Sequence, residues 1–473
     1  MSACCLVKVV SDPHLASCAC SYKSSSMILN RAEHHLVYTD MHIPLLSRSL
    51  VRSTMPLSNS SFTLDASGVA GFFGGDEAVS AMATVHVYQG RKWLGWYNSP
   101  GSYLVGKRYG QLANSRFWDG LFPGVNTDPA TLFELDGWKG PKFKGVESGS
   151  IIPETGHLAA LMVKECQTEM GVEVPGRKTQ PIGVTIIDLH HVPEARMKPT
   201  QLKRYTSVFA FIPISVSIIT CVMCGFFGDW FCFSMILLGM LASGISCFVI
   251  GSGSFMFYHP VPAPGAPRGD GLLLADNNVI ILLGEEGAVN SITRGNFSLN
   301  FGSEPEYRNI GLCSLLLTTQ FIAQLLLIPQ GSLFGQIMFV TSLAVSWAYN
   351  SWLSSLDKEE IQRRLLLDVV LQRPLMTKYM LGTRTTMAVF VLLALNPSAP
   401  GKVLDDILPN DTKVWKKWKS TILSRLQNGE KMHFGITDWD DENFDEKEST
   451  LLKTLLGDAQ AAYDGYNDHL KSH

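Results

Sequence analysis

The sequence predicts an α-helical polytopic membrane protein with four transmembrane helices arranged as two hairpins and with cytosolic α+β flanking regions. Two long stretches that carry almost no charge predict this fold class. Between Tyr205 and Tyr258 the only charged residue is Asp229, and between Asn309 and Leu356 there is none. Because one helical crossing of a bilayer needs roughly 20 apolar residues, each stretch is long enough for two crossings.

A short break divides each uncharged stretch. Residues 228–230 (Gly-Asp-Trp) divide the first stretch, and residues 329–332 (Pro-Gln-Gly-Ser) divide the second. Without its break, the second stretch would form a helix about 70 Å long, which is far longer than one bilayer needs. We therefore expect transmembrane hairpins at 205–256 and 309–356.

The rest of the chain differs in composition from these hairpins. The 473 residues are 46% hydrophobic, which is typical of a protein that combines embedded and exposed parts. We expect a disordered, Ser-rich tail at 1–65, cytosolic regions at 66–204 and 357–473, and a cytosolic loop at 257–308. The net charge of -3 gives no case for a nucleic-acid partner, because a phosphate-binding surface should show clustered Lys and Arg.

Positive charges beside the expected helices predict the orientation. Lys203 and Arg204 precede the first stretch and Arg363 and Arg364 follow the second, whereas the two short turns carry no Lys or Arg. By the positive-inside rule, both termini then face the cytosol. No signal peptide is visible before Asp12. We expect an integral protein of the endomembrane system or plasma membrane, with the lipid bilayer as its partner.

Apolar runs outside the uncharged stretches predict strands. Thr84–Tyr88 and Val184–Leu189 have strand character. In the loop at 257–308, the runs Gly271–Ala275 and Val279–Leu283 are separated by Asp-Asn-Asn. This pattern predicts a β-hairpin with a three-residue turn.

The loop between the expected membrane hairpins contains the sequence GDGLLLADNNVIILLGEEGAVNSITRGNFSL at residues 269–299. Together with the paired hydrophobic hairpins around it, this loop resembles multi-pass membrane proteins of mushroom-type (basidiomycete) fungi. The resemblance covers roughly Pro181 to Leu395. It implies a fungal lineage and the same topology, and it brings no activity, cofactor or site residue.

Small residues recur every four positions in the second expected helix. They are Gly239, Ser243, Cys247 and Gly251, which share one face of a helix. Because a stripe of small side chains lets helices approach closely, we expect this face to pack against another helix.

Three amide side chains are the main polar groups within the other expected helices. Gln320 and Gln324 are one turn apart in the third helix, and Asn350 lies near the end of the fourth. They either hydrogen-bond to neighbouring helices or form the polar lining of a pathway. Ion-coupled transport usually needs an ionisable residue at membrane depth, and none is expected there. Packing is therefore the first interpretation, and an oligomeric transporter or channel is the alternative.

The C-terminal region contains amphipathic patterns. Lys413–Leu426 combines basic and apolar residues at helical spacing, which suits the surface of an anionic membrane leaflet. The residues of this expected membrane-surface helix are Lys413, Trp415, Lys416, Lys417, Trp418 and Lys419. A surface helix that packs its apolar side on protein explains the pattern equally well. Further helices are expected at Asp357–Val370, Thr385–Leu395 and Leu451–Leu470. Thr385–Leu395 has only 11 residues and is therefore expected to be interfacial or buried and not a fifth transmembrane helix.

No residue pattern typical of an active site stands out. Asp188 and His190 share one face of an expected strand and would have to carry any membrane-enzyme activity, but no third metal ligand accompanies them. Cys221 and Cys224 have a redox or zinc spacing without a neighbouring His or Cys. We therefore expect no enzyme activity, no catalytic residue, and no metal or cofactor. The expected role is a non-enzymatic scaffold, sensor or assembly component, with a second copy or other proteins as cytosolic partners.

Overall fold

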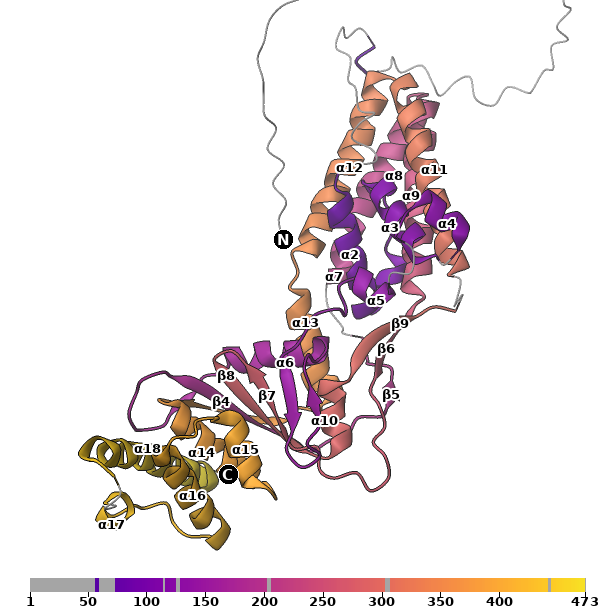
Figure 1. Ribbon diagram of the computed structural model, residues 1–473. Coiled ribbons are helices and arrows are strands. Elements are labelled where there is room, and N and C mark those ends of the chain that lie inside the picture. Colours follow the sequence, from indigo (N-terminus) through magenta and orange to yellow (C-terminus); the bar gives the residue numbers. More distant parts are fainter. Residues whose placement is uncertain are drawn as a thin grey trace, which may run out of the picture. The chain divides into compact units, whose positions relative to one another are not determined.

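The computed structural model describes residues 56–58, 73–113, 115–124, 128–201, 206–302, 307–440 and 444–472 (Figure 1). Within them the chain folds as a mixed α/β protein with a seven-stranded sheet, a three-stranded sheet and a bundle of helices. The expected tail at 1–65 lies almost entirely outside the described residues.

The seven-stranded sheet has the strand order β2-β1-β7-β8-β4-β10-β3. Its strands are β1 (Lys142–Gly145), β2 (Ile151–Ile152), β3 (Val172–Glu173), β4 (Ile182–Leu189), β7 (Gly271–Ala275), β8 (Asn278–Gly284) and β10 (Leu375–Leu381). β4 pairs in parallel with β8 and antiparallel with β10, so that Val184 lies beside Val279 on one side and Tyr379 on the other. The sheet therefore combines strands from three regions that we expected to be separate: 66–204, 257–308 and 357–473.

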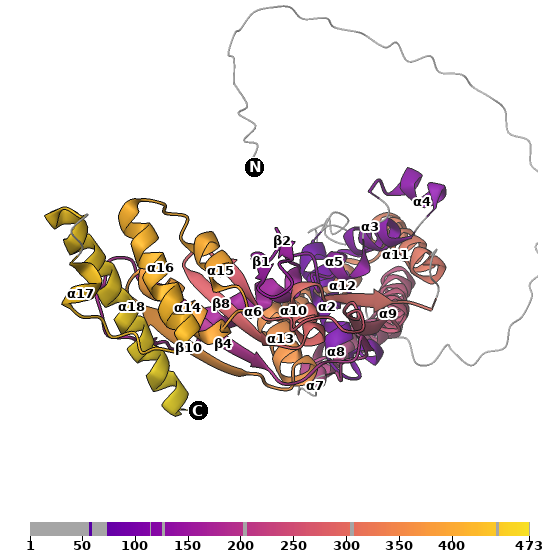
Figure 2. The ribbon, with the colours of Figure 1, turned by 60° about the horizontal axis from the view of Figure 1, so that its bottom comes forward.

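Helices cover both faces of this sheet, which explains why its central strands are almost continuously apolar. In β8, Val279 and Ile281 belong to one core and Ile280 and Leu282 to the other, as the two-residue period of a strand requires. The first face is covered by α14 (Arg384–Leu395), α15 (Pro400–Ile407), α16 (Lys413–Asn428) and α18 (Glu446–Ser472), with α17 (Ile436–Trp439) beside α18 (Figure 2). The second is covered by α6 (His157–Thr168), α10 (Glu286–Thr293) and α13 (Lys358–Arg364), which continues into a π-helix at Leu365–Val370.

The expected β-hairpin is present as β7 and β8. Ala275 pairs with Asn278, so the turn consists of Asp276 and Asn277 and is one residue shorter than predicted. The strand expected at Val184–Leu189 lies within β4. Thr84–Tyr88 is not a strand, because Thr84 to Val87 form the last turn of a buried helix. A short apolar run has the same appearance in both settings.

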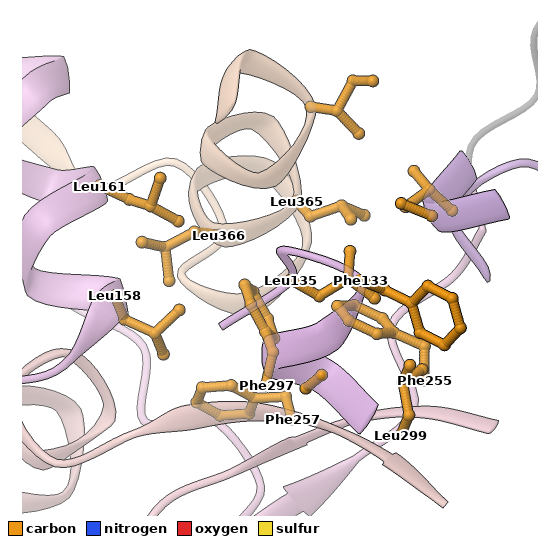
Figure 3. Packing of buried hydrophobic residues seen from close by; sticks show 14 of the residues in the cluster. Phe133, Leu135, Leu158, Leu161, Phe255, Phe257, Phe297, Leu299, Leu365 and Leu366 are labelled. Atoms are coloured by element: carbon orange, nitrogen blue, oxygen red, sulfur yellow. The ribbon is translucent and has the colours of Figure 1, made fainter. Parts of the chain in front are cut away.

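The three-stranded sheet is antiparallel, with the order β5-β6-β9. Its strands are β5 (Arg196–Met197), β6 (Ser254–Tyr258) and β9 (Asn296–Asn300). Phe255, Phe257 and Phe297 from this sheet pack in one core with Leu158 of α6 and Leu365 of the π-helix (Figure 3). This core is continuous with the second face of the large sheet.

Six helices pack together into what we name the helical body. They are α2 (Gly75–Val87), α3 (Ser102–Leu112), α8 (Phe211–Phe226), α9 (Trp230–Gly251), α11 (Arg308–Leu327) and α12 (Leu333–Ser354) (Figure 1). α3 lies along α11, and α2 lies along α12 and contacts α9. Three short helices lie nearby in sequence: α4 (Arg116–Leu121), α5 (Pro129–Leu132) and α7 (Thr206–Phe209).

The predicted fold class, an α-helical polytopic membrane protein with four transmembrane helices, is wrong. Helices do occur in both uncharged stretches, but they belong to a mixed α/β fold, and a multi-pass topology is not supported. In the described part of the chain, two helices are long and apolar enough to cross a bilayer: Trp230–Gly251, whose most apolar segment is 50% buried in the protein, and Arg308–Gln330, with 39% buried. α8 has only 16 residues. The error has a physical cause. A helix buried inside a protein can be as free of charge as a helix that crosses a bilayer, and here α2 and α3 cover part of the surface of the uncharged helices.

Candidate functional site

Large apolar side chains are exposed along three neighbouring helices of the helical body. In α9 they recur with helical spacing at Leu237, Leu241, Ile245 and Phe248, and each is 37–44% exposed. α8 and α11 continue this surface, which we name the apolar face. Its residues are Phe211, Ile212, Ile218, Ile219, Val222, Phe226, Leu237, Leu241, Ile245, Phe248, Leu312, Leu315, Ile322, Leu325 and Leu326. Soluble monomers rarely expose so many large apolar side chains together.

The surface between α8 and α12 is hollowed into an apolar groove of about 340 Å³. Its lining residues are Phe209, Ile212, Pro213, Val345, Ala348, Tyr349 and Trp352. None of them is charged, and the Tyr349 hydroxyl has no hydrogen-bond partner in the described chain. The groove shares Ile212 with the apolar face and is lined for an apolar occupant.

The interior of the helical body is polar where the irregular segment between α2 and α3 passes through it. The Tyr97 hydroxyl donates a hydrogen bond to Asn350 Oδ1 at 2.8 Å, and Asn350 Nδ2 donates to Ser99 Oγ at 3.2 Å. Asn98 Nδ2 donates to Ser342 Oγ at 2.8 Å. Because buried polar groups must find partners inside the protein, these contacts fix the segment against α12.

The two predicted glutamines lie together and are buried. Gln320 Nε2 is 3.4 Å from Gln324 Oε1, and Gln324 Nε2 donates to the backbone carbonyl of Met235 at 3.3 Å. Asn350 is not hydrogen-bonded to them. It connects to them only through Ser99, which accepts its hydrogen bond and lines a small cavity with Gln320.

This cavity lies in the middle of the helical body and measures about 10 Å³, which is room for one water molecule. Four polar atoms that face it or flank it have no partner among the described residues: the hydroxyls of Ser102, Ser243 and Ser246, and Gln320 Oε1. The cavity volume corresponds to one water molecule and does not test whether a transport pathway exists. The oligomeric transporter or channel therefore stays a prediction.

The stripe of small residues on α9 lies against the irregular segment. A Cβ atom added at Gly239 would come within 2.0 Å of Asn98 Oδ1, and one added at Gly251 within 2.3 Å of Lys92 Cβ. One added at Gly95 would lie 2.3 Å from Cys247 Cβ and 3.3 Å from the carbonyl oxygen of Ser243. The stripe thus lets the segment between α2 and α3 approach α9, and helices approach the same stripe, since the added Cβ atoms would also lie 2.6 Å from Val85 of α2 and 3.2 Å from Gln324 of α11.

The C-terminal segment expected at a membrane surface is α16. Its apolar side lies against α18: Trp418 is fully buried and its indole N–H donates to the carbonyl of Leu455 at 3.0 Å. Trp415 packs beside Trp418. The lysine side faces outward at Lys413, Lys416 and Lys417, while Lys419 pairs with Asp405 at 2.7 Å. The apolar side of this helix is therefore covered by protein, and Lys416 on its outer side pairs with Asp411 at 3.4 Å.

Asp188 and His190 are exposed at the end of β4, with 3.5 Å between Asp188 Oδ1 and His190 Nδ1. Within the described ranges, no three His, Cys, Asp or Glu side chains gather as a metal site would require. Cys221 and Cys224 are buried in α8. The structure adds no further ligand to either pair.

A cavity of about 300 Å³ lies between the large sheet and the helices α14 and α15. Lys144 of β1 forms an ion pair with Asp406 of α15 in its wall, and Arg384 donates to the carbonyl of Ile407 at 2.9 Å. The remaining lining is mostly apolar, including Leu272 and Val279. Sequence reasoning missed this cavity because its walls come from segments far apart in the chain, and no local motif marks them.

No protein-family model, curated protein or solved structure matches the chain. The resemblance of residues 269–299 to fungal proteins therefore stays a prediction. Function has to be inferred from the surfaces and cavities of the chain itself.

Proposed function

We propose that the protein is a non-enzymatic, lipid-associated scaffold. In this proposal, the apolar face of the helical body contacts lipid acyl chains, and the large sheet with its covering helices carries the surfaces that bind partners. The observation that carries the proposal is the apolar face, in which α8, α9 and α11 expose many large apolar side chains, and the only charged residue of these three helices is Arg308 at the start of α11.

The composition of the face favours lipid over a protein partner. α8 and α9 contain no charged residue. The polar side chains on their exposed sides, other than the indole of Trp230, are hydroxyls such as those of Ser215 and Ser234. The Ser234 hydroxyl already donates to the carbonyl of Trp230 at 2.8 Å. A protein interface normally forms one hydrogen bond per 100–200 Å² and has a polar rim. Lipid acyl chains form no hydrogen bonds, so a face with almost no polar groups suits acyl chains better than a protein partner.

Aromatic side chains flank the face. Trp230 begins α9 and is 64% exposed, and Trp93 packs beside Phe248 near the other end of that helix, with 4.8 Å between ring centroids. Tryptophan is enriched where an apolar medium meets water, because its ring is apolar and its N–H is polar. The apolar groove beside Trp352 offers a place for one acyl chain. Contact between this face and lipid does not require the four membrane-spanning helices that the sequence predicted.

Flotation with lipid vesicles tests the proposal. Full-length protein is purified in detergent, mixed with phosphatidylcholine vesicles, freed of detergent and centrifuged through a density gradient. We expect the wild type to float with the vesicles. A variant with Leu241→Glu and Ile245→Glu places two carboxylates on the apolar face and should stay at the bottom of the gradient.

The matched control carries Met170→Glu and Ile436→Glu. These two side chains are 93% and 72% exposed but lie outside the helical body, so the control should float like the wild type. A wild type that remains monodisperse without detergent and does not float would refute lipid contact.

A further inference from the structure

A separate cavity of about 430 Å³ lies at the end of α9. Its walls come from the segment after α2, from the residues that follow β5, and from the connection between α9 and β6. Lys92 and Lys198 are the charged residues of its lining, and no carboxylate lines it. The cavity is therefore positive without any acidic group to offset it.

Neither lysine has an ion-pair partner among the described residues. Lys198 is exposed, and Lys92 is half-buried with its stem against Gly251. Two lysines without a carboxylate partner give this cavity a positive potential, which favours binding of an anion. Thr200 and Ser254 add hydroxyl groups to the same lining, whereas the Ser252 hydroxyl already donates to the carbonyl of Val249 at 2.6 Å. Ammonium and hydroxyl donors together are the groups that bind phosphate oxygens.

The cavity adjoins the apolar face. Lys92 Nζ lies 5.8 Å from the centre of the Trp93 ring and 5.9 Å from the centre of the Phe248 ring. Phe248 is the last member of the exposed stripe that runs along α9 through Leu241 and Ile245. A molecule with its charged end in the cavity can therefore lay an apolar chain along this stripe.

We propose that this cavity binds the phosphate group of an anionic phospholipid whose acyl chains lie along α9. The placement of the acyl chains rests on the proposed function, whereas the recognition of phosphate by Lys92 and Lys198 does not. Free phosphate offers the same chemistry to the two lysines, so the two sources must be separated by experiment.

Thermal unfolding with small soluble probes separates them. The full-length protein in non-ionic detergent is titrated with dihexanoyl-phosphatidylglycerol, with dihexanoyl-phosphatidylcholine, or with inorganic phosphate, and Tm is measured. A ligand that binds only the folded state raises Tm. We expect the largest rise with phosphatidylglycerol, a small one with phosphatidylcholine, and a weakening of the response as salt is added.

Three double variants locate the effect. Lys92→Gln with Lys198→Gln should lose at least half of the rise, and Lys92→Arg with Lys198→Arg should keep it. Lys139→Gln with Lys178→Gln removes the same charge from exposed positions elsewhere and should respond like the wild type. The arginine variant guards against a result that reflects poor folding alone.

Each outcome has a distinct meaning. Equal, lysine-dependent rises with phosphatidylglycerol and inorganic phosphate would retain the anion site but overturn the lipid as its source. No rise with either probe, or an unchanged response in the glutamine variant, would overturn the site. A lysine-dependent rise in a protein that fails to float on vesicles would refute the apolar-face proposal and leave the anion site standing.

Discussion

The carboxylate of Asp229 accepts two hydrogen bonds from Ser332, one from its backbone N–H at 2.7 Å and one from its hydroxyl at 2.5 Å. The residues are 103 positions apart and lie in the turns before α9 and α12. Asp229 also caps α9 by accepting from the N–H of Cys232, and the Ser332 hydroxyl caps α12 by accepting from the N–H of Gly335. One buried carboxylate thus holds the starts of two helices together.

Replacing Asp229 should loosen both helix starts. Asp229→Ala removes a helix cap and leaves a half-buried N–H of Ser332 without this partner, so we expect a loss of about 1–3 kcal/mol in the free energy of unfolding. Asp229→Asn keeps one acceptor oxygen and should lose clearly less. Urea unfolding monitored by circular dichroism gives both values. Equal losses in the two variants would mean that both carboxylate oxygens are needed as acceptors.

The close approach of α9 to the irregular segment makes Gly239 sensitive to a single methyl group. In Gly239→Ala the new Cβ would collide with Asn98 Oδ1, which would have to move and strain its hydrogen bond to Ser342. We expect a loss of about 1–3 kcal/mol from overpacking. Gly457→Ala is the matched control, because Gly457 lies within α18 with nothing within 4 Å of the added Cβ. It should stabilise the protein by roughly 0.5–1 kcal/mol, so two identical substitutions should change Tm in opposite directions.

Asp458 attaches α18 to the rest of the C-terminal layer. This buried carboxylate accepts from Arg177 Nη2 at 2.7 Å, from the Thr383 hydroxyl at 3.1 Å and from the Thr385 hydroxyl. Asp458→Ala removes a shared acceptor and leaves the Thr383 and Thr385 hydroxyls only each other, at 2.9 Å, and Thr386, while Arg177 is half-exposed and regains water, so we expect a loss of about 1–3 kcal/mol. Faster hydrogen exchange in α18 should accompany it. Asp464→Ala, at an exposed position of the same helix, should change neither quantity; if it does, the effect belongs to the helix and not to the buried carboxylate.

His86 should make the folded state sensitive to acid. Burial lowers the pKa of His86 from 6.5 to about 4, and the nearby backbone of Gly253 opposes this only in part. The folded state therefore holds the neutral ring, whereas the unfolded chain binds a proton as the pH falls below 6.5. Stability contributed by the neutral ring is present above pH 6.5 and is lost as the pH falls toward 4, by up to about 3 kcal/mol.

The variant His86→Leu tests this pH dependence. Leucine fills a similar space beside Phe133 and Phe301 and cannot be protonated. The difference in unfolding free energy between the variant and the wild type should change between pH 7 and pH 4 in favour of the variant. Parallel pH profiles would show that His86 is protonated at the same pH in both states.

Local patterns in the sequence predicted several elements well. The hairpin of β7 and β8 follows from two apolar runs around a turn, and α16 and α18 follow from helical spacing of apolar residues. The fold class failed because an uncharged helix is equally compatible with lipid and with a protein interior. Only the partners of the helix decide between these settings, and the partners here are α2 and α3, which the sequence placed in another region.

The candidate sites show the same limit. Gln320 and Gln324 lie one turn apart in a helix, so their proximity could be predicted. Asn350 meets Tyr97 from 253 positions away, and no local signal indicates that pairing. The two lysines at the end of α9 are likewise brought to one cavity by folding alone.

The pairing of β4 also dictates when the chain can finish folding. Val184 is made early, but its neighbour Val279 emerges from the ribosome only after the helices of the first uncharged stretch, and Tyr379 only after those of the second. Pairing across such separations is slow, and newly made helices must wait for it. During synthesis the apolar side chains of β4 therefore stay incompletely covered until the sheet is assembled. A chain that stops short of Leu381 would leave one edge of β4 incompletely paired and would become a substrate for chaperones and proteases.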